Sequence, residues 1–356
     1  MKKTLKIAGI VLLALLLVVL AYVAYVFLSY HRIEDNLSLT PEGNASASVR
    51  TGTPYTVVSY NIGFGAYEAD YSFFMDGGTE SWAWSKERLD ANLANIAQVL
   101  QKQNADFYFV QEVDAGSTRS YHRDEAALLR QALPNFSSVW GQNYDSPFLF
   151  WPLTQPHGSS VSGLMTFSSA PISSSLRRSL PIEQGVMKLV DLDRCYTVSR
   201  VPMENGKELV LYAVHLSAYT SDGTIALDQM EMLLSDMQSE YEKDNYCVCG
   251  GDFNKDVLGN SEEVFGVSAG EYTWAQPLPE SLFHGRDLTL VPPLDRENPV
   301  ASCRNADAPY HDGQYLVTVD GFLVSNNVSV SDATVIDTGF AYSDHNPVSM
   351  TFTLLP

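Results

Sequence analysis

Eight polar residues of kinds that perform acid–base or metal chemistry stand at or near the ends of apolar runs. They are Asn61, Glu112, His215, Asp252, Asn254, Asp320, Asp344 and His345. Carboxylates can bind a divalent cation or accept a proton, imidazoles exchange a proton near neutral pH, and amides can hydrogen-bond an anionic oxygen. Because these four carboxylates, two histidines and two asparagines all sit beside strand-like runs, they predict one catalytic site.

Each of these residues also has an ordinary explanation when it is taken alone. Asp252 follows Gly250 and Gly251 and could be a turn residue, and the stretch Ser343–Pro347 could be a turn before an edge strand. In an α/β sheet, however, the ends of neighbouring strands meet along one edge, where binding sites form. The repetition of the pattern, rather than any single residue, favours a functional site.

The surrounding sequence alternates between strand-like and helix-like segments. Runs rich in β-branched and aromatic residues predict strands at 55–61, 106–112, 163–167, 195–201, 209–215, 246–252, 318–324 and 348–353. Helical spacing of apolar residues predicts helices at 85–103, 126–133 and 226–241, with Ser85 as the N-cap of the first. This alternation is typical of the α/β (α+β) class.

Long loops at 63–84, 141–162 and 255–317 interrupt the alternation. Loops of this length are uncommon unless they are functional. The first carries aromatic residues between Tyr67 and Trp84, and the second carries Phe148, Phe150 and Trp151. Such aromatic side chains could contact a lipid or a sugar beside the site, or they could form local hydrophobic cores.

Six stretches of the sequence resemble the motifs of the endonuclease/exonuclease/phosphatase superfamily. They are Ser59–Asn61, Val110–Val113, His215–Leu216, Gly250–Asn254, Val319–Val324 and Ser343–Val348. Gly-Asp-Phe-Asn followed by Ser-Asp-His-Asn-Pro-Val is highly specific in this order, and the resemblance extends over 54–356. It implies a DNase I-like fold, a four-layer sandwich of two mixed β-sheets flanked by helices, and hydrolysis of a phosphodiester or phosphomonoester.

The resemblance also implies a divalent metal ion and the residues that hold it. Glu112 matches the metal-binding glutamate, Asn61 matches the residue beside the metal, and Asp344 can also reach it. Mg²⁺ is the expected ion, because it prefers oxygen ligands and usually takes only one or two carboxylates. Mn²⁺ and Ca²⁺ are the alternatives.

Five further residues match the family's catalytic set. Asp252 matches the residue that orients and deprotonates the attacking water, and Asn254 is placed to donate its amide to a phosphoryl oxygen. His345 matches the histidine that contacts the scissile phosphate, with Asp320 as its carboxylate partner. His215 matches a second histidine of the DNase I-like, sphingomyelinase-like and inositol-phosphatase-like branches, which the abasic-site repair branch lacks.

Three residues are further candidates for contact with substrate. Arg119 and Tyr121 closely follow Glu112, so they could bring a cation and a phenol to the phosphate, or they could belong to a solvated loop. Arg200 lies on the strand before His215 and resembles an arginine near the active site in some branches of the family.

The first thirty residues differ in composition from the rest of the chain. A basic segment, 1–6, precedes an uncharged apolar stretch, 7–30, which is long enough to cross a bilayer at about 1.5 Å per residue. The alternative is a cleaved signal peptide, but its apolar region is normally about 7–15 residues long. The positive-inside rule then predicts a single-pass cell-membrane protein with a tether, 31–53, and an extracytoplasmic catalytic domain, 54–356.

The charge of the chain limits its partners. The 356 residues carry a net charge of -20 at pH 7, and tight binding to duplex DNA is not expected because it requires many Lys and Arg side chains on phosphates. The expected partners are the membrane and a phosphoester substrate, which could be a lipid headgroup, a small phosphoester or a nucleic acid; a monomer is expected. A nuclease is the alternative within the family. A catalytically inactive module that binds a phosphorylated ligand is the alternative of another class, but such a module should lack Glu112, Asp252 or His345.

The four cysteines leave the redox state of the domain open. They are Cys195, Cys247, Cys249 and Cys303. An exported domain can form disulfides, but the spacing fixes no pairing. Buried thiols are the alternative, with Cys247 and Cys249 facing the same side of one strand.

Overall fold

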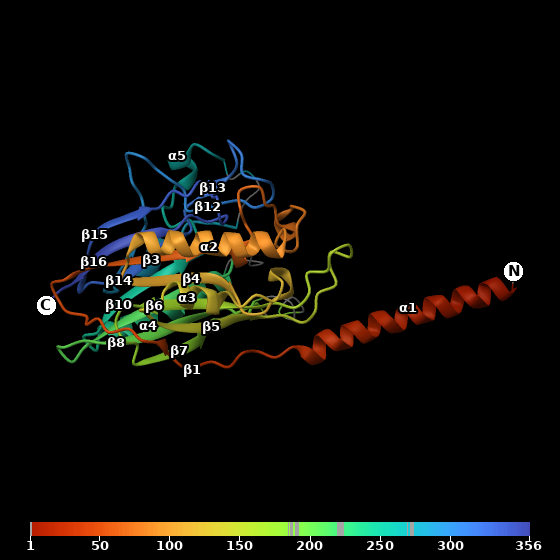
Figure 1. Cartoon of the computed structure of the whole chain (residues 1–356), viewed down its shortest axis with the longest axis horizontal. Helices are drawn as coiled ribbons and strands as arrows, with labels where there is room; N and C mark the ends of the chain where they lie inside the picture. The colour runs from red at the N-terminus through yellow and green to blue at the C-terminus, as the bar shows by residue number, and fades with distance from the viewer. Residues whose placement is uncertain are drawn as a thin grey trace.

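Two seven-stranded β-sheets pack face to face at the centre of the molecule (Figure 1). The computed structural model describes the chain except residues 1, 184, 186–187, 189–191, 219–223, 269 and 271–273. Figure 1 shows the strands of both sheets running in roughly the same direction, with α2 drawn across the domain in front of them.

The first sheet holds the strand that begins the domain and the strand that ends it. Its order is β15 (Val328–Val335), β16 (Val348–Leu354), β3 (Pro54–Asn61), β4 (Phe107–Asp114), β6 (Val161–Ser168), β5 (Ser137–Asp145) and β2 (Glu42–Gly43). β3 and β4 are parallel, and the other neighbours are antiparallel. The sheet is therefore mixed, as expected.

The second sheet has the same number of strands and one parallel pair, β9 with β10. Its order is β1 (Leu37–Leu39), β7 (Ser174–Ser179), β8 (Cys195–Pro202), β9 (Glu208–His215), β10 (Tyr246–Asp252), β14 (Asp320–Ser325) and β11 (Leu288–Val291). A small ribbon of β12 (Cys303–Arg304) and β13 (Leu316–Val317) lies outside both sheets.

Helices cover the outer face of each sheet, so the domain has four layers. α2 (Lys86–Gln103) and α3 (Glu125–Ala132) pack on the first sheet, and α4 (Thr224–Tyr241) packs on the second. The core between the sheets is built from side chains such as Val57, Phe109 and Leu211, which are fully buried. Burying a side chain of this size stabilises the fold by about 1.5–3 kcal/mol. The DNase I-like sandwich inferred from the sequence is confirmed.

Short helical segments occupy the loops and the ends of strands. They are η1 (Gly63–Gly65), η2 (Phe74–Asp76), η3 (Thr118–Ser120), α5 (Ser261–Phe265) and η5 (Glu280–Phe283). Among the longer helices, α2 begins where Ser85 Oγ accepts a hydrogen bond from the Arg88 amide, as predicted, and ends at Asn104 in the left-handed conformation. An N-cap of this kind is worth about 1 kcal/mol.

The N-terminal helix, α1 (Lys2–Ser29), projects away from the domain (Figure 1). It is long and apolar enough to cross a membrane, and its most apolar window is not buried against the domain. A signal sequence near an N-terminus has the same properties. The structure therefore contains a candidate membrane helix at the position expected from the sequence.

The segment that follows α1 is attached to the domain, in contrast to the free tether expected from its composition. Leu37–Leu39 extends the second sheet as β1 by pairing with β7, and Glu42–Gly43 pairs with β5. The buried Arg177 guanidinium donates hydrogen bonds to the carbonyl oxygens of Ile33 and Glu34. Edge strands offer unpaired backbone groups, which is why a sequence without apolar periodicity still becomes ordered here.

All four cysteines are buried free thiols. Cys247 and Cys249 both belong to the core between the second sheet and α4, as their alternation along β10 predicts. The alternative of buried thiols therefore describes this structure.

Candidate active site

The two parallel strand pairs bring four of the expected residues to the same edge of the sandwich. Asn61 ends β3 in register with Gln111 of β4, next to Glu112. His215 ends β9 in register with Asp252, which ends β10. Because the two sheets pack face to face, the ends of both pairs meet at a common edge, here called the rim.

Asn61 links the carboxylates of the two sheets. Its Nδ2 lies 3.1 Å from Asp252 Oδ2 and 3.3 Å from Glu112 Oε1, while its Oδ1 accepts a hydrogen bond from the Gly63 amide at 3.0 Å. The amide oxygen is therefore turned away from the carboxylates. Asn61 positions Glu112 and Asp252 in this structure, and it does not present an oxygen toward them as the metal ligand expected from the sequence would.

Asp252 lies at the centre of the site and is almost completely buried. Its Oδ1 accepts the Asn254 backbone amide at 2.7 Å, and its Oδ2 lies 3.4 Å from His215 Nε2. Burial raises the pKa of Asp252 to about 7, against the lowering effect of the nearby His345. A carboxylate that titrates near neutral pH suits a general base.

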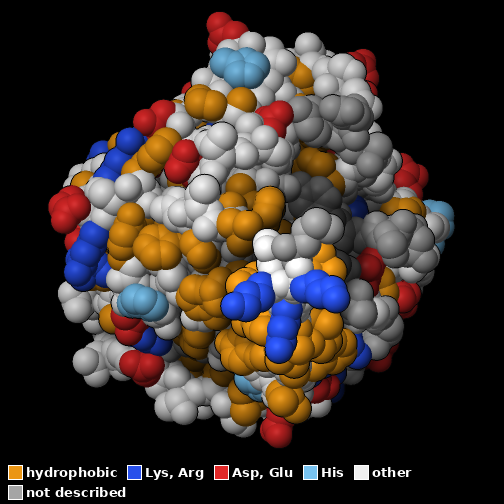
Figure 2. Space-filling model, turned by 90° about the vertical axis from the view of Figure 1, so that its right-hand side faces the viewer, with side chains coloured by type: hydrophobic (Ala, Val, Ile, Leu, Met, Phe, Trp, Pro, Cys, Tyr) orange, Lys and Arg blue, Asp and Glu red, His pale blue; other side chains and the backbone are white. Residues whose placement is uncertain are grey.

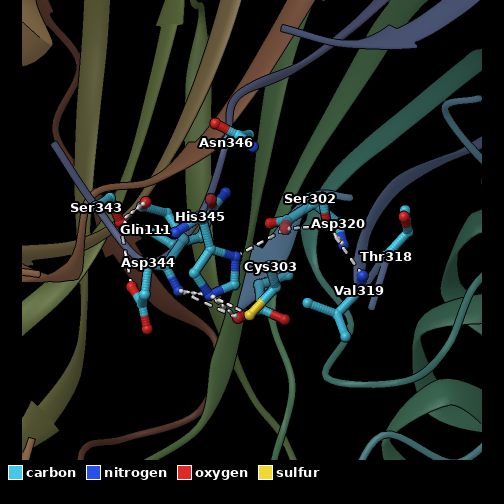
Figure 3. Close-up of polar contacts among 12 residues, drawn as sticks. Gln111, Ser302, Cys303, Thr318, Val319, Asp320, Ser343, Asp344, His345 and Asn346 are labelled. Atoms are coloured by element: carbon cyan, nitrogen blue, oxygen red, sulfur yellow. Dashed lines mark hydrogen bonds and ion pairs between the residues drawn. The ribbon is translucent and has the colours of Figure 1, made fainter. Parts of the chain in front are cut away.

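His345 and Asp320 form a buried ion pair (Figure 3). Asp252 lies beside this pair. His345 Nδ1 donates to Asp320 Oδ2 at 2.7 Å, and Ser302 Oγ donates to the same oxygen at 2.7 Å. Burial opposes the charged imidazole, but Asp320 outweighs it and raises the pKa of His345 well above its usual value. His345 is therefore held as an imidazolium whose Nε2 lies 3.8 Å from Asp252 Oδ2.

The second histidine is in the opposite state. Burial lowers the pKa of His215 well below its usual value, and the positive charges of Arg194 and His345 lower it further. Its Nδ1 has no hydrogen-bond partner in the described chain. The site thus contains one charged and one neutral imidazole on either side of Asp252.

Asn254 follows Asp252 after one residue, and its backbone is in the left-handed region with φ 49°. Its Nδ2 donates to the Leu216 carbonyl oxygen at 2.8 Å. This contact ties the end of β10 to the segment after β9. In this conformation the Asn254 side chain braces the site, and donation to a phosphoryl oxygen, as expected from the sequence, would require this contact to be exchanged.

Glu112 projects from an irregularity in β4. The register between β4 and β6 shifts between Val110 and Val113, and Glu112 has φ 56°, which is unusual for a residue with a side chain. Glu112 is half-buried, and Asn61 is its one side-chain hydrogen-bond partner in the described part of the chain. The irregularity therefore directs a carboxylate with free oxygen lone pairs toward the rim.

Asp344 lies near Glu112. Burial raises the pKa of Asp344, and the negative charge of Glu112 raises it further. Two half-buried carboxylates that repel each other fit a hard divalent cation, which would relieve the repulsion. Glu112 and Asp344 are therefore the residues whose chemistry fits the expected ion.

A second group could also hold a metal by proximity alone. Asp252, Asp320 and His345 place one ligand atom each within 4.8 Å of one another. In this group, however, His345 already donates one nitrogen to Asp320 and is held charged, whereas a metal ligand must be a neutral imidazole. The geometry of this group favours acid–base chemistry.

Arg119 and Tyr121 lie near the rim but are already engaged. The Arg119 guanidinium makes a two-point contact with Asp114, at 3.0 and 2.9 Å, and lies 4.0 Å from the centre of the Phe64 ring. Tyr121 donates its hydroxyl to the Ala83 carbonyl oxygen. Both side chains therefore support the loops behind Glu112, and neither presents its polar group to a substrate in this structure.

Arg200 lies away from the other candidates. It pairs with Val210, five residues before His215, which places it roughly 17 Å along the strand at about 3.3 Å per residue. There it contacts Glu240 at 2.7 Å and Glu208 at 2.6 Å. The substrate contact expected for Arg200 does not fit this position. The sequence shows that Arg200 lies on a strand, but it does not indicate which end of the sheet the residue is near.

Two supporting residues have no clear signal in the sequence. Ser302 holds Asp320 and also accepts hydrogen bonds from the Val319 and Asp320 amides. Arg304 is fully buried, and its guanidinium donates to the carbonyl oxygens of Glu68 and Asn305, among others. Both lie in the long loop 255–317, where no periodicity marks them.

Similarity to known proteins identifies the family of the chain and supports its fold. The model of the Endonuclease/Exonuclease/phosphatase family matches residues 58–345. The chain belongs to this family. Its members hydrolyse phosphoric ester bonds and generally use a divalent metal. No curated protein matches the chain.

Solved structures share the fold at low sequence identity. An endonuclease/exonuclease/phosphatase from Beutenbergia cavernae DSM 12333 is 17% identical with a TM-score of 0.55, covering 86% of this chain and 72% of the other. ANGEL2, a 2',3'-cyclic phosphatase, is 16% identical with a TM-score of 0.55, covering 89% and 98%. The human Nocturnin catalytic domain is 18% identical with a TM-score of 0.53, covering 89% and 97%.

Proposed function

We propose that the chain is a membrane-anchored, Mg²⁺-dependent phosphoesterase whose catalytic domain lies on the extracytoplasmic side of the cell membrane. The observation that carries the proposal is the hydrogen-bonded series Glu112–Asn61–Asp252 beside the His345–Asp320 pair. It provides an open carboxylate for a cation, a carboxylate that titrates near neutral pH, and a fixed imidazolium within a few ångströms.

Each component has a defined role in hydrolysis. Asp252 accepts the proton of the attacking water, because its pKa of about 7 allows it to be ionised at neutral pH and still act as a base. His345 holds a positive charge against the phosphoryl oxygens, and Asp320 keeps the imidazole charged and oriented. The ion that Glu112 and Asp344 would hold supplies further positive charge at the phosphoryl group.

The anchor and its orientation are supported by α1 and its flanking charges. Lys2, Lys3 and Lys6 lie before the apolar stretch, and an excess of positive charge marks the cytoplasmic side. The domain follows α1 and is therefore proposed to face the other side.

The test uses the full chain in detergent micelles with a panel of phosphodiesters and phosphomonoesters, including single-stranded DNA, an inositol phosphate and a sphingomyelin-type lipid. We expect hydrolysis of at least one substrate with Mg²⁺ and none after chelation. Glu112→Ala and Asp252→Ala should each abolish it while the circular dichroism spectrum stays unchanged.

Two results would contradict the proposal. Full activity of both variants on every substrate would show that the chemistry lies elsewhere. Binding of phosphorylated ligands without hydrolysis of any of them would favour the inactive binding module instead.

A further inference from the structure

The loop between β5 and β6, residues 146–160, leaves the sheet at the catalytic rim; it is called the finger below. β5 ends at Asp145 opposite Val161, and Asp114, two residues after Glu112, pairs with Ser162. The base of the finger is therefore next to the strand that carries the metal-site carboxylate. The finger and the active site face the same side of the domain.

The finger is a built element with several internal and external contacts. Leu149 and Gly158 exchange two backbone hydrogen bonds, and the His157 amide donates to the Trp151 carbonyl oxygen. Its far side is held by the loop before α2, where Trp82 Nε1 donates to the Pro156 carbonyl oxygen. Its conformation is thus supported independently of α1.

At its tip the finger exposes large apolar side chains. Phe150, Trp151 and Leu153 are 51%, 66% and 76% exposed. Three neighbouring apolar side chains of this exposure are costly in water, and a tip of this kind is typical of a surface that meets an apolar partner. Figure 2 views the rim from the side of α1 and shows hydrophobic side chains gathered beside the helix.

The finger also contacts the helix that is proposed to cross the membrane. Tyr22 donates its hydroxyl to the Phe148 carbonyl oxygen at 3.0 Å, and the Phe148 amide donates to Tyr25 Oη at 3.0 Å. The Phe150 ring packs edge-on against Tyr22 with centroids 5.0 Å apart. The finger therefore lies alongside the last turns of α1.

The position of these contacts along α1 fixes the depth of the finger. Tyr22 and Tyr25 lie seven and four residues before the end of α1 at Ser29. At about 1.5 Å per residue, the finger reaches about 6–10 Å below the end of the helix. If α1 spans the bilayer, this is the level of the interface, where aromatic side chains are favoured.

The chain that leaves α1 keeps the rim close to this level. The Ile33 amide donates to Asp193 Oδ2, and Arg177 holds the Ile33 and Glu34 carbonyl oxygens. Asp193 lies two residues before β8, whose start is opposite the end of β9 that carries His215. Ile33 is four positions after Ser29, so the two residues can lie at most about 14 Å apart. The rim cannot move far from the end of α1 while these contacts persist.

The geometry points to a lipid bilayer as the partner of the finger and to a phospholipid headgroup ester as the substrate of the active site. This inference rests on the proposed function, because it requires α1 to be in the membrane and the rim residues to be catalytic. Phe150, Trp151 and Leu153 enter the interface beside α1. The catalytic rim then faces the headgroups, and a phosphoester reaches it from the membrane surface.

The first experiment measures insertion without using activity. The full chain is placed in phosphatidylcholine nanodiscs containing a lipid with a quencher near the headgroup, and tryptophan fluorescence is compared with that of Trp151→Phe. We expect the emission of the wild-type protein to contain a blue-shifted component that the quencher lipid suppresses. This component comes from Trp151, so the variant should lack it. Equal quenching in the two proteins would overturn the docking of the finger in the bilayer.

The second experiment tests the substrate class in the same nanodiscs. Phe150→Ser/Trp151→Ser/Leu153→Ser should lower hydrolysis of a bilayer-borne phospholipid at least ten-fold and leave hydrolysis of a soluble nitrophenyl phosphodiester unchanged. Leu355→Ser, which alters an exposed leucine at the C-terminal end of the chain, should change neither rate.

The outcomes separate the two proposals. Equal losses on both substrates would show that the finger only supports the site. Faster hydrolysis of soluble single-stranded DNA than of the phospholipid would overturn the lipid substrate class but leave the phosphoesterase intact. Inactivity toward every ester would overturn both the proposed function and the substrate class, whereas the quenching result would still decide whether the finger meets the membrane.

Discussion

Two clusters of buried carboxylates lie at opposite ends of β9 and β10, and they differ in how far their neighbours compensate the buried negative charge. At the start of β9 and β10, Glu240 accepts hydrogen bonds from Arg200, Lys243 and Asn245. At the other end, Asp252 lies between two histidines and close to Asp320. In the first cluster, several hydrogen-bond donors surround Glu240. In the second cluster, Asp252 has a second carboxylate, Asp320, as a neighbour.

The pKa values express this difference. Burial raises the pKa of Glu240, but hydrogen bonds from Arg200, Lys243 and Asn245 outweigh it and lower the value to about 2. Burial raises the pKa of Asp252 to about 7, and its partners do not compensate. The charge of Glu240 therefore stabilises the fold, whereas the charge of Asp252 costs stability and is available for chemistry. Residue type alone does not distinguish these two carboxylates, whereas the hydrogen-bond donors around Glu240 and the acid groups around Asp252 do.

The largest expected difference between the clusters is in activity. His345→Gln removes the fixed positive charge beside Asp252, so we expect kcat/KM to fall by about 10²–10⁴-fold. Arg200→Gln, at the other cluster, should leave kcat/KM per folded molecule unchanged. Steady-state kinetics on the substrate found for the wild-type protein measure both, and a comparable loss in Arg200→Gln would remove the distinction between the two clusters.

The next largest effect is a loss of stability, and we expect it at the Glu240 cluster rather than at the Asp252 cluster. Arg200→Gln leaves Glu240 and Glu208 without their shared partner, so we expect the free energy of unfolding to fall by roughly 2–4 kcal/mol. Denaturant unfolding of the full chain in detergent, followed by tryptophan fluorescence, measures this change. A loss below about 0.5 kcal/mol would mean that the cluster behaves as an exposed ion pair.

A smaller effect on stability is expected when the charge of Asp252, the proposed general base, is removed. Asp252 has a folded pKa of about 7 and an unfolded pKa of about 3.9. Between about pH 4 and pH 7 Asp252 is ionised in the unfolded chain but still protonated in the folded chain. The free energy of unfolding therefore falls as pH rises through this range, and the full loss is present above pH 7. Asp252→Asn should raise the free energy of unfolding by roughly 1–3 kcal/mol at pH 8 without metal, and the gain should vanish near pH 4.

The smallest expected effect is the change in the free energy of unfolding when the charge of Glu240 is removed. Its folded pKa of about 2 lies below the unfolded value, so its contribution to stability is present above about pH 4.5 and is lost as pH falls toward 2. Glu240→Gln should lower the free energy of unfolding by roughly 1–2 kcal/mol at pH 7, with the difference shrinking below pH 4.5. The measurement is the free energy of unfolding of each variant minus that of the wild type, as a function of pH. The same sign of this difference for Glu240→Gln and Asp252→Asn would contradict the comparison.

The sequence predicts the cluster around Asp252, which is proposed to be catalytic, better than the cluster around Glu240. Asn61, Glu112, His215 and Asp252 could be placed together because strand ends in parallel register share an edge, which is a local pattern. Arg200 could not be placed, because a position on a strand does not show whether the residue faces the rim or the opposite end. Its partners Glu208 and Glu240 come from another strand and from a helix.

Several elements of the fold also lie beyond local patterns. β7 reads Ser-Ser-Leu-Arg-Arg-Ser and becomes a strand because β8 pairs with it, not because of its own propensity. β1 forms in the same way on β7. The irregularity at Glu112 depends on the pairing of β4 with β6, so the sequence could identify the glutamate but not the backbone that directs it.

The contact of Arg177 with the chain after α1 has a kinetic consequence in the proposed anchored state. A domain on a slack linker would sample a hemisphere of solution, and its rate would follow the bulk concentration of substrate. Arg177 binds the Ile33 and Glu34 carbonyl oxygens and leaves no such slack. With the phospholipid substrate proposed above, such an enzyme would meet its substrate by diffusion in the plane of the membrane. Its turnover would then scale with the number of substrate molecules per unit area and fall when the bilayer is diluted with inert lipid.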